Sequence, residues 1–322
     1  SARKFLIASG STWRDDHIPG LDEVAHHTPQ TILSLKRPPK TLFVVGSGTT
    51  AMELAYLFST FGSKVYVAET AGRILPEFDQ EVGELIAADA KAQRGMNILT
   101  QTKLVAVQKD GIAKRVTYAR GGQQHSVRVD EILIADDRLP TTDIGLENAG
   151  VAYTEHGIQV SEAMQTSARH IFAAGSVVDL QAQTHTILSR TAAHNLLHRN
   201  FIALDDTPRL TIAFTDPQIA RTGLDEDDCL RRDLKINIAL APLTLTARSN
   251  ITDRRSGFVK LISDKKGVLL GATIVAPGAS DLMTGLSLAI RHGLTAKQLM
   301  STPNCFVAWS EAVRIAAGKL AA

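Results

Sequence analysis

The chain has 322 residues, of which 44% are hydrophobic and 21% charged, and its 35 basic and 33 acidic residues leave a formal charge of +2. These values are typical of a globular protein of two or three domains and exclude a disordered or fibrous chain. They give no reason to expect a nucleic-acid partner, which would require clustered Lys and Arg, and no apolar run approaches the roughly 20 residues of a membrane span.

The first predicted elements follow an α/β pattern. Residues 4–8 are strand-like, and the proline-bearing segment 36–40 can continue neither a helix nor a central strand. After this linker we predict a strand over 42–45, a helix over 49–61, a strand over 64–68 and a helix over 79–93 with Asp79 as its N-cap. Strands and helices that alternate in this way predict a parallel sheet covered by helices.

Short strands dominate the rest of the chain. Between 97 and 135, the pair Gly121-Gly122 predicts a hairpin, and residues 127–134 are expected to form one strand. A strand over 171–175 and a helix over 186–200 come next. Beyond a boundary at 204–208 we expect strands over 210–214, 236–240, 257–262 and 268–275, then helices near 279–292 and 308–318. This last part is predicted to be an α+β domain.

A glycine motif joins the strand at 42–45 to the helix that follows. Gly46, Gly48 and Ala51 form GxGxxA in a strand, turn and helix context, which is the dinucleotide-binding fingerprint. Gly46 permits the tight turn, Gly48 lets a pyrophosphate approach the backbone, and Ala51 allows close packing of helix and strand. The amides and the positive dipole end of the helix would then face the phosphates. The alternative is a tight turn that binds no ligand.

An acidic residue ends the second strand of this unit. Glu69 follows Gly46 at close to the spacing of about 20 expected for the acid that accepts a ribose 2′-hydroxyl. Because a carboxylate repels a 2′-phosphate, we expect NAD(H) rather than NADP(H), although Arg73 stands nearby.

The whole chain resembles the flavin-dependent pyridine nucleotide–disulfide oxidoreductases, and in particular mercuric reductase-like and dihydrolipoyl dehydrogenase-like members. The resemblance rests on short motifs along the full length, namely Ile7–Ser11, Ile18–Gly20, Gly46–Glu53, Arg73–Pro76, Ile171–Gly175, Phe214–Pro217 and Ser310-Glu311.

The resemblance implies a fold and a set of segments. The fold class is α/β: a Rossmann-like nicotinamide domain, a remnant of an FAD domain and a C-terminal α+β dimerisation domain. The segments are 1–38 (FAD-domain remnant), 39–157 (NAD(P)-binding domain), 158–204 (returning FAD-domain segment) and 205–322 (dimerisation domain), which implies a homodimer.

Site residues also carry over from the resemblance. Gly10, Gly175 and Ser176 would lie against FAD, and Glu53 beside the junction of nicotinamide and flavin. Glu311 matches the acid that accompanies the family's acid/base histidine. The implied reaction is hydride transfer from NAD(P)H to FAD.

The chain departs from the family pattern at several positions. It contains no first GxGxxG for FAD and no Cys-x4-Cys redox pair. It has Ser176 where the family has Asp, and Asp136-Asp137 replace the two middle residues of the family's ATGR motif. Phe306 stands where many members have the histidine. We therefore expect a truncated, split or degenerate oxidoreductase, the split form needing a separate chain that supplies the flavin half. The alternative is a non-catalytic dimeric NAD(H)-binding or scaffold protein.

The two cysteines and the histidines are expected to be chemically quiet. Cys229 is predicted to lie inert at the surface and Cys305 to be a buried small hydrophobe. So few cysteines favour a reducing, cytoplasmic setting. His194 and His198 share a helix face but lack a third ligand, so we predict no metal site.

Overall fold

The computed structural model describes residues 2–14, 18–180, 184–204 and 209–321. The chain divides into two compact units, one of residues 1–15 with 137–211 and the other of residues 16–136 with 212–322. The sequence placed boundaries after residues 38, 157 and 204 instead, and those domain limits stay predictions. Residues 205–208 of the proposed third boundary lie outside the described chain.

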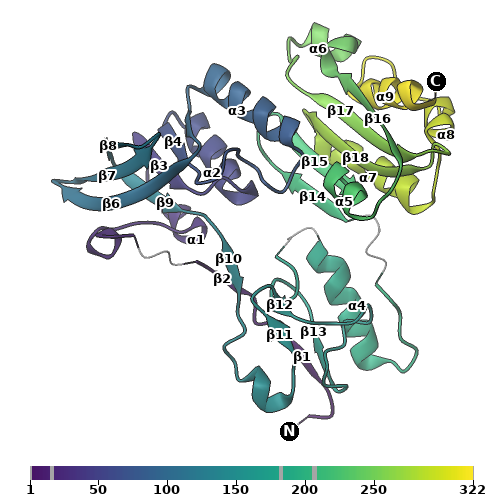
Figure 1. Cartoon of the computed structure of the whole chain (residues 1–322), viewed down its shortest axis with the longest axis horizontal. Helices are drawn as coiled ribbons and strands as arrows, with labels where there is room; N and C mark the ends of the chain where they lie inside the picture. The colour runs from purple at the N-terminus through teal and green to yellow at the C-terminus, as the bar shows by residue number, and fades with distance from the viewer. Residues whose placement is uncertain (1, 15–17, 181–183, 205–208, 322) are drawn as a thin grey trace. The chain divides into compact units, whose positions relative to one another are not determined.

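A parallel sheet forms the first half of the larger unit, as the sequence predicted. Its strand order is β5 (Asn97–Leu99), β4 (Lys64–Ala68), β3 (Thr41–Val45) and β9 (Glu131–Ile134). Helices α2 (Thr49–Thr60) and α3 (Gln80–Arg94) connect these strands, and their apolar sides share a core with the sheet (Leu42, Val44, Met52, Ala55, Val67 and Ile86). The short helix α1 (Pro29–Ile32) packs against α2 and β9. This is the Rossmann-like arrangement (Figure 1).

An antiparallel sheet of β6 (Thr102–Asp110), β7 (Ala113–Arg120) and β8 (Gln123–Val129) follows β5. The hairpin predicted at Gly121-Gly122 is confirmed, because Arg120 pairs with Gln123. The single strand predicted over 127–134 is wrong: β8 ends at Val129, and β9 begins at Glu131 in the parallel sheet. Asp130 causes the break, since its carboxylate accepts hydrogen bonds from the backbone N–H and the hydroxyl of Thr41 and so directs the chain toward β3.

The second half of the larger unit is an antiparallel sheet in the order β14 (Leu210–Ala213), β15 (Gln218–Gly223), β18 (Leu269–Ala276), β17 (Phe258–Asp264) and β16 (Ile236–Pro242). Helix α7 (Ala279–Arg291) packs on β15 and β18, and α9 (Glu311–Ala321) packs on β16 and β17 (Figure 1). Three short helices complete it: α5 (Glu226–Arg231), α6 (Ala247–Ile251) and α8 (Ala296–Ser301). The α+β prediction is confirmed here, but strand β15 was not predicted.

Both cysteine predictions were wrong. Cys229 is buried on α5, and Cys305 is exposed. Burial raises the pKa of the Cys229 thiol, and the carboxylates of Asp228 and Asp225 raise it further. The thiol therefore stays protonated under ordinary conditions.

In the described residues of the smaller unit, the strands form three two-stranded sheets. Strand β1 (Phe5–Ile7) runs parallel to β13 (Ile171–Ala173), β2 (Ser11–Trp13) pairs with β10 (Arg138–Pro140), and β11 (Tyr153–Thr154) pairs with β12 (Gly157–Ile158). Helix α4 (His185–Leu197) packs on β1 and β13. Within the described parts of both units, no helix has the length and apolar character needed to cross a membrane.

A buried lysine joins the two halves of the larger unit. Lys260 of β17 is only 1% exposed, and its Nζ lies 2.6 Å from Asp79, 2.5 Å from Glu81 and 2.8 Å from Glu226. Asp79 is the N-cap of α3, as predicted, but its carboxylate binds Lys260 and the Thr273 hydroxyl rather than capping the helix. Burial lowers the pKa of Lys260, but hydrogen bonds to the three carboxylates outweigh it and the pKa is raised.

Replacing this lysine should destabilise the protein. In Lys260→Met the three carboxylates keep their charges and lose the common cation, which should cost about 2–4 kcal/mol of unfolding free energy. The measurement is chemical denaturation at neutral pH. Lys265→Met, which removes an exposed lysine that bonds Ile236 and Asn237 at the surface, should change stability by less than about 0.5 kcal/mol. Equal effects of the two substitutions would contradict a structural role for Lys260.

Candidate functional site

The turn after β3 depends on a glycine. Gly46 has φ of +97°, and a Cβ placed on it would lie 2.6 Å from the Ala135 carbonyl oxygen and 2.7 Å from the Asp136 Cα. A residue with a side chain would therefore be strained and would also collide with the end of β9. Because these contacts are to backbone, a rotamer change cannot relieve them.

Backbone hydrogen bonds fix this turn to three neighbouring segments. The Gly46 N–H donates to Ala68 at the end of β4 (2.9 Å), and the Ala135 N–H donates to Val45 (2.9 Å). The Leu75 N–H donates to the Ser47 carbonyl (3.0 Å). Ala51, one turn into α2, is completely buried. The structure thus brings the predicted residues Gly46, Gly48 and Ala51 together at the carboxyl edge of the parallel sheet.

Glu69 lies at the same edge and is held by short hydrogen bonds. The hydroxyl of Ser47, a residue only 1% exposed, donates to Glu69 Oε2 at 2.5 Å. Oε1 accepts the Ala71 N–H at 2.6 Å and the Thr70 hydroxyl at 3.2 Å. Each carboxylate oxygen can accept more than one hydrogen bond, so the group can still receive a ligand hydroxyl. No role was predicted for Ser47, although it stands between the two fingerprint glycines.

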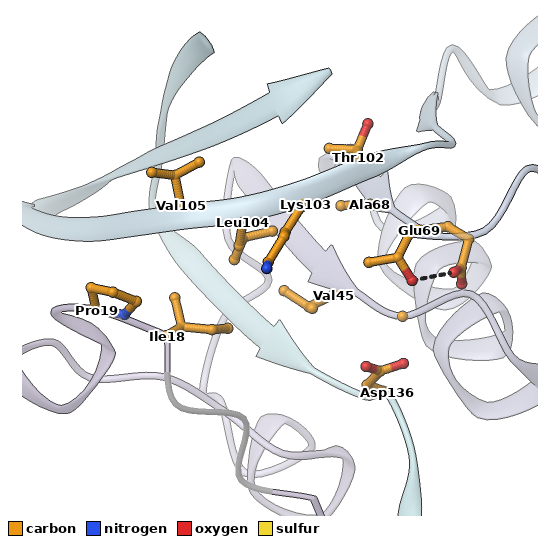
Figure 2. Close-up of a pocket in the computed structure, with 12 residues that line it drawn as sticks. Ile18, Pro19, Val45, Ala68, Glu69, Thr102, Lys103, Leu104, Val105 and Asp136 are labelled. Carbon is orange, nitrogen blue, oxygen red and sulfur yellow. Dashed lines mark hydrogen bonds between the residues drawn. The ribbon is translucent and has the colours of Figure 1, made fainter. Parts of the chain in front are cut away.

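A cavity of about 620 Å³ opens beside this edge. Its lining includes Gly46, Glu69 and Asp136, together with Ile18, Pro19, Val45, Ala68, Thr70 and residues 102–105 of β6. Figure 2 shows Lys103 reaching from β6 into this space above Val45 and Ile18, with Glu69 and Asp136 at the strand ends. A volume of this size is ordinary for a cofactor site.

Lys103 and its neighbours on β6 were not predicted as site residues. They come to the cavity through the packing of the antiparallel sheet against the parallel one, and no local spacing in the sequence signals that approach. Asp136 does line the cavity, whereas Asp137 belongs to the smaller unit, where it pairs with Arg14 at 3.0 Å.

Arg73 does not extend into the cavity. Its guanidinium donates to the Phe78 carbonyl at 2.6 Å and to the Pro76 carbonyl at 3.2 Å, so it holds the loop that precedes α3. This cation is therefore committed to the fold of its own loop.

Two further glutamates lie near the start of α2. Glu77 Oε1 accepts the Thr49 N–H at 3.1 Å. Glu53 accepts the Phe214 N–H at 2.8 Å, which joins α2 to the segment after β14. Burial raises the pKa of Glu53, the hydrogen bond from Phe214 opposes that rise, and the nearby charge of Glu77 adds to it. A carboxyl with a raised pKa beside a cofactor fingerprint is a candidate functional group.

The predicted flavin contacts gather in the smaller unit. A Cβ on Gly10 would lie 3.9 Å from Ser176 Oγ, and Gly10 accepts the Thr141 N–H at 2.9 Å. Gly175 has φ of +82°, and its carbonyl accepts the Val178 and Asp179 N–H groups. The nearest following acid, Asp179, accepts hydrogen bonds from Thr184 and Arg209. Gly10 and Ser176 therefore lie close together, next to Gly175, and their role in holding FAD stays a prediction.

Glu311 lies elsewhere, in the half of the larger unit that contains β14–β18. It begins α9, and its Oε2 accepts the Ala247 N–H at 3.1 Å at the start of α6. Among the described residues, no recorded contact joins it to Glu53. A catalytic role for either glutamate stays a prediction.

Comparison with known proteins gives a consistent result. Residues 1–195 match the family described as pyridine nucleotide-disulphide oxidoreductase, and residues 210–317 match its dimerisation domain. Mercuric reductase from Bacillus cereus is 32% identical over 98% of this chain and 51% of its own length. Dihydrolipoyl dehydrogenase from Thermus scotoductus is 32% identical over 99% of this chain and 70% of its own length. The chain thus spans about half the length of the first of these relatives.

Solved structures agree with the sequence matches. The HOCl-induced flavoprotein disulfide reductase RclA from Escherichia coli superposes with a TM-score of 0.87 at 25% identity, covering 98% of this chain and 73% of that one. LpdA from Mycobacterium tuberculosis superposes with a TM-score of 0.86 at 26% identity, covering 98% and 69%.

The turn geometry predicts a difference between two glycines at the ends of α2. Gly46 and Gly62 both have positive φ, but a Cβ on Gly62 meets open space. Gly62→Ala should cost about 1–2 kcal/mol for the left-handed conformation alone. Gly46→Ala should cost about 1–3 kcal/mol more because the methyl group meets the backbone of β9. Denaturant titration of both variants measures the difference, and equal costs would show that the collision is not present in solution.

Proposed function

Because the chain belongs to the pyridine nucleotide–disulfide oxidoreductase family, we propose that its larger unit binds NAD(H) and presents the nicotinamide for hydride transfer to FAD. The observation that carries this proposal is the convergence of the glycine turn, Glu69 and a cavity of about 620 Å³ at one edge of the parallel sheet. This convergence supports dinucleotide binding more strongly than the motif alone.

The residues of the turn fit the cofactor by their chemistry. Gly46 allows the turn to pass close to the end of β9, the absence of a side chain at Gly48 leaves room at the start of α2 for a pyrophosphate once the Glu77 side chain moves, and the first amides of α2 provide donors. Glu69, oriented by Ser47 and Ala71, accepts the ribose hydroxyls. FAD, when bound, supplies the acceptor of the hydride. Glu53 holds the Phe214 amide and so fixes the start of α2 relative to the segment after β14.

NAD(H) is proposed over NADP(H). A 2′-phosphate would meet the carboxylate of Glu69, and Arg73 is engaged with its own loop. Among the described residues that line the cavity, Lys103 is the cation. We propose that the ammonium group of Lys103, on its flexible side chain, attracts a 2′-phosphate too weakly to outweigh the repulsion between that phosphate and Glu69.

FAD would be held by the cradle of Gly10, Gly175 and Ser176, in which the serine offers a hydroxyl instead of a carboxylate. Strand β1 leaves Phe5 and Leu6 more than 40% exposed, which favours further polypeptide packing there, including a separate chain that carries the flavin half. In the dimerisation domain, exposed apolar side chains such as Phe214, Leu288 and Phe306 favour a homodimer.

A second candidate is a non-catalytic dimeric NAD(H)-binding or scaffold protein. Ser176 favours this candidate because it offers FAD a hydroxyl where the family has a carboxylate. The cysteines also favour it, because buried Cys229 on α5 and exposed Cys305 are both free and form no redox pair. An absorption spectrum of the purified protein separates the two candidates. Bound flavin that NADH bleaches supports the oxidoreductase, and NADH binding by a protein that takes up no added FAD supports the scaffold.

NADH binding tests the part that both candidates share. Gly48→Asp places a carboxylate at the start of α2, in the path proposed for the pyrophosphate. The new Cβ would lie 2.8 Å from Glu77 Oε1, so the added side chain has little free space there. We expect affinity for NADH, measured by fluorescence titration, to fall at least about tenfold. Gly285→Asp places the same charge in open space on α7 and should leave the affinity unchanged. Equal affinity of the wild type and Gly48→Asp would refute binding at this turn.

Cofactor selectivity tests the role of Glu69. Removing the carboxylate in Glu69→Ala should weaken NADH and relieve the repulsion of NADPH, so the ratio of the two dissociation constants should shift toward NADPH by about tenfold. Glu84→Ala removes an exposed carboxylate from α3 and should not change the ratio. An unchanged ratio in Glu69→Ala would show that another residue sets the selectivity.

A further inference from the structure

The N-terminus of α2 already holds an anionic group that belongs to the chain. Glu77 Oε1 lies 3.1 Å from the Thr49 N–H and 3.5 Å from the Thr49 hydroxyl. The same oxygen would lie 2.8 Å from a Cβ on Gly48, so it fills the space that the missing side chain leaves. This is the place where the fingerprint leads a pyrophosphate to approach the backbone.

The loop that carries Glu77 is fixed on both sides. Before it, the Leu75 N–H donates to the Ser47 carbonyl at 3.0 Å, and Arg73 binds the carbonyls of Pro76 and Phe78. After it, Asp79 is held by buried Lys260 at 2.6 Å. The backbone of Glu77 therefore remains beside α2, and only the side chain can change position.

In the part of the chain that the structure describes, only one oxygen of the Glu77 carboxylate has a hydrogen-bond donor. Glu77 Oε2 is buried and, among the described residues, accepts no hydrogen bond. Its charge also acts on the half-buried Glu53 one turn further along α2. A buried acceptor without a donor costs free energy, so Glu77 is held by one oxygen while the other is unsatisfied.

A pyrophosphate oxygen and this carboxylate cannot share the Thr49 amide. Both are anionic acceptors, and at contact distance two like charges repel strongly where water is partly excluded. We propose that Glu77 is an internal competitor of the dinucleotide: its carboxylate occupies the Thr49 amide in the free protein and must leave before the pyrophosphate binds. The inference rests on the proposed function and adds to it a residue that lowers the affinity for NAD(H).

Two substitutions separate the charge of Glu77 from its hydrogen bond. Glu77→Gln keeps an oxygen acceptor and removes the charge, and Glu77→Ala removes both. We expect NADH to bind more tightly to Glu77→Gln than to the wild type, and more tightly again to Glu77→Ala, by about tenfold in total. The measurement is fluorescence titration of the full chain with NADH, and the control is Glu84→Gln, which removes an exposed charge from α3.

Smaller probes locate the effect at the phosphates. ADP-ribose contains the pyrophosphate without nicotinamide, so its affinity should rise by the same factor as that of NADH. Adenosine contains no phosphate, and its affinity should not change. A gain for adenosine equal to that for ADP-ribose would overturn the inference, because it would reflect a general opening of the cavity.

The remaining outcomes are also decisive. Glu77 variants that bind NADH no more tightly than the wild type would refute competition and leave Glu77 as a structural cap of α2, while the proposed function stands. If neither the wild type nor any variant binds NADH or ADP-ribose, the proposed function fails and this inference fails with it. Thermal melting without ligand identifies loss of folding, and where Glu77→Ala does not fold, Glu77→Gln decides the question.

Discussion

The geometry of the site depends on the point where three parallel strands end together. Strands β4, β3 and β9 reach the same edge, and the turn after β3 must pass between its neighbours within hydrogen-bond distance of both. Gly46 makes this possible because it adopts a positive φ and has no atom where β9 ends. The close approach then brings Ser47 to Glu69. Glu69, the proposed ribose acceptor, is thus positioned by the packing of the sheet, and the hydrogen bonds of its side chain complete the arrangement.

The half of the larger unit formed by β14–β18 also contributes to this site. Lys260 on β17 binds Asp79 and Glu81 at the start of α3, and the loop just before that point contains Glu77. Because Leu75 binds the fingerprint turn on the other side, the loop is fixed at both ends. A lysine in the second half of the unit therefore anchors the end of the loop whose Glu77 faces the N-terminus of α2.

The sequence predicted the parallel sheet and the positions of the glycine turn and of Glu69 at its edge, because each follows from a local pattern: apolar strands, helical periodicity and fixed spacing. It failed where tertiary contacts decide. Asp130 divides the segment 127–134, which was predicted as one strand, by binding Thr41, which lies 89 residues away. Cys229 is buried although its neighbours along the chain are acidic, while the adjacent Leu230 is exposed, so local composition did not indicate which side of α5 is covered. Lys103 reaches the cavity from another sheet, and Glu77 reaches α2 from the loop before α3, so no spacing rule identifies either residue.

The charge around the cavity determines what kind of binding site this is. A dinucleotide is anionic, yet Glu69 and Asp136 line the cavity, Glu77 lies at the helix N-terminus, and Glu53 is close enough to feel its charge. Lys103 is the lining cation, and Arg73 is turned into its own loop. In the proposed NAD(H) site, attraction between opposite charges would therefore contribute little, and backbone amides at the start of α2 would provide most of the affinity for phosphate. In such a site, a single carboxylate on those amides controls binding more effectively than one at the rim, because it competes for the donors themselves.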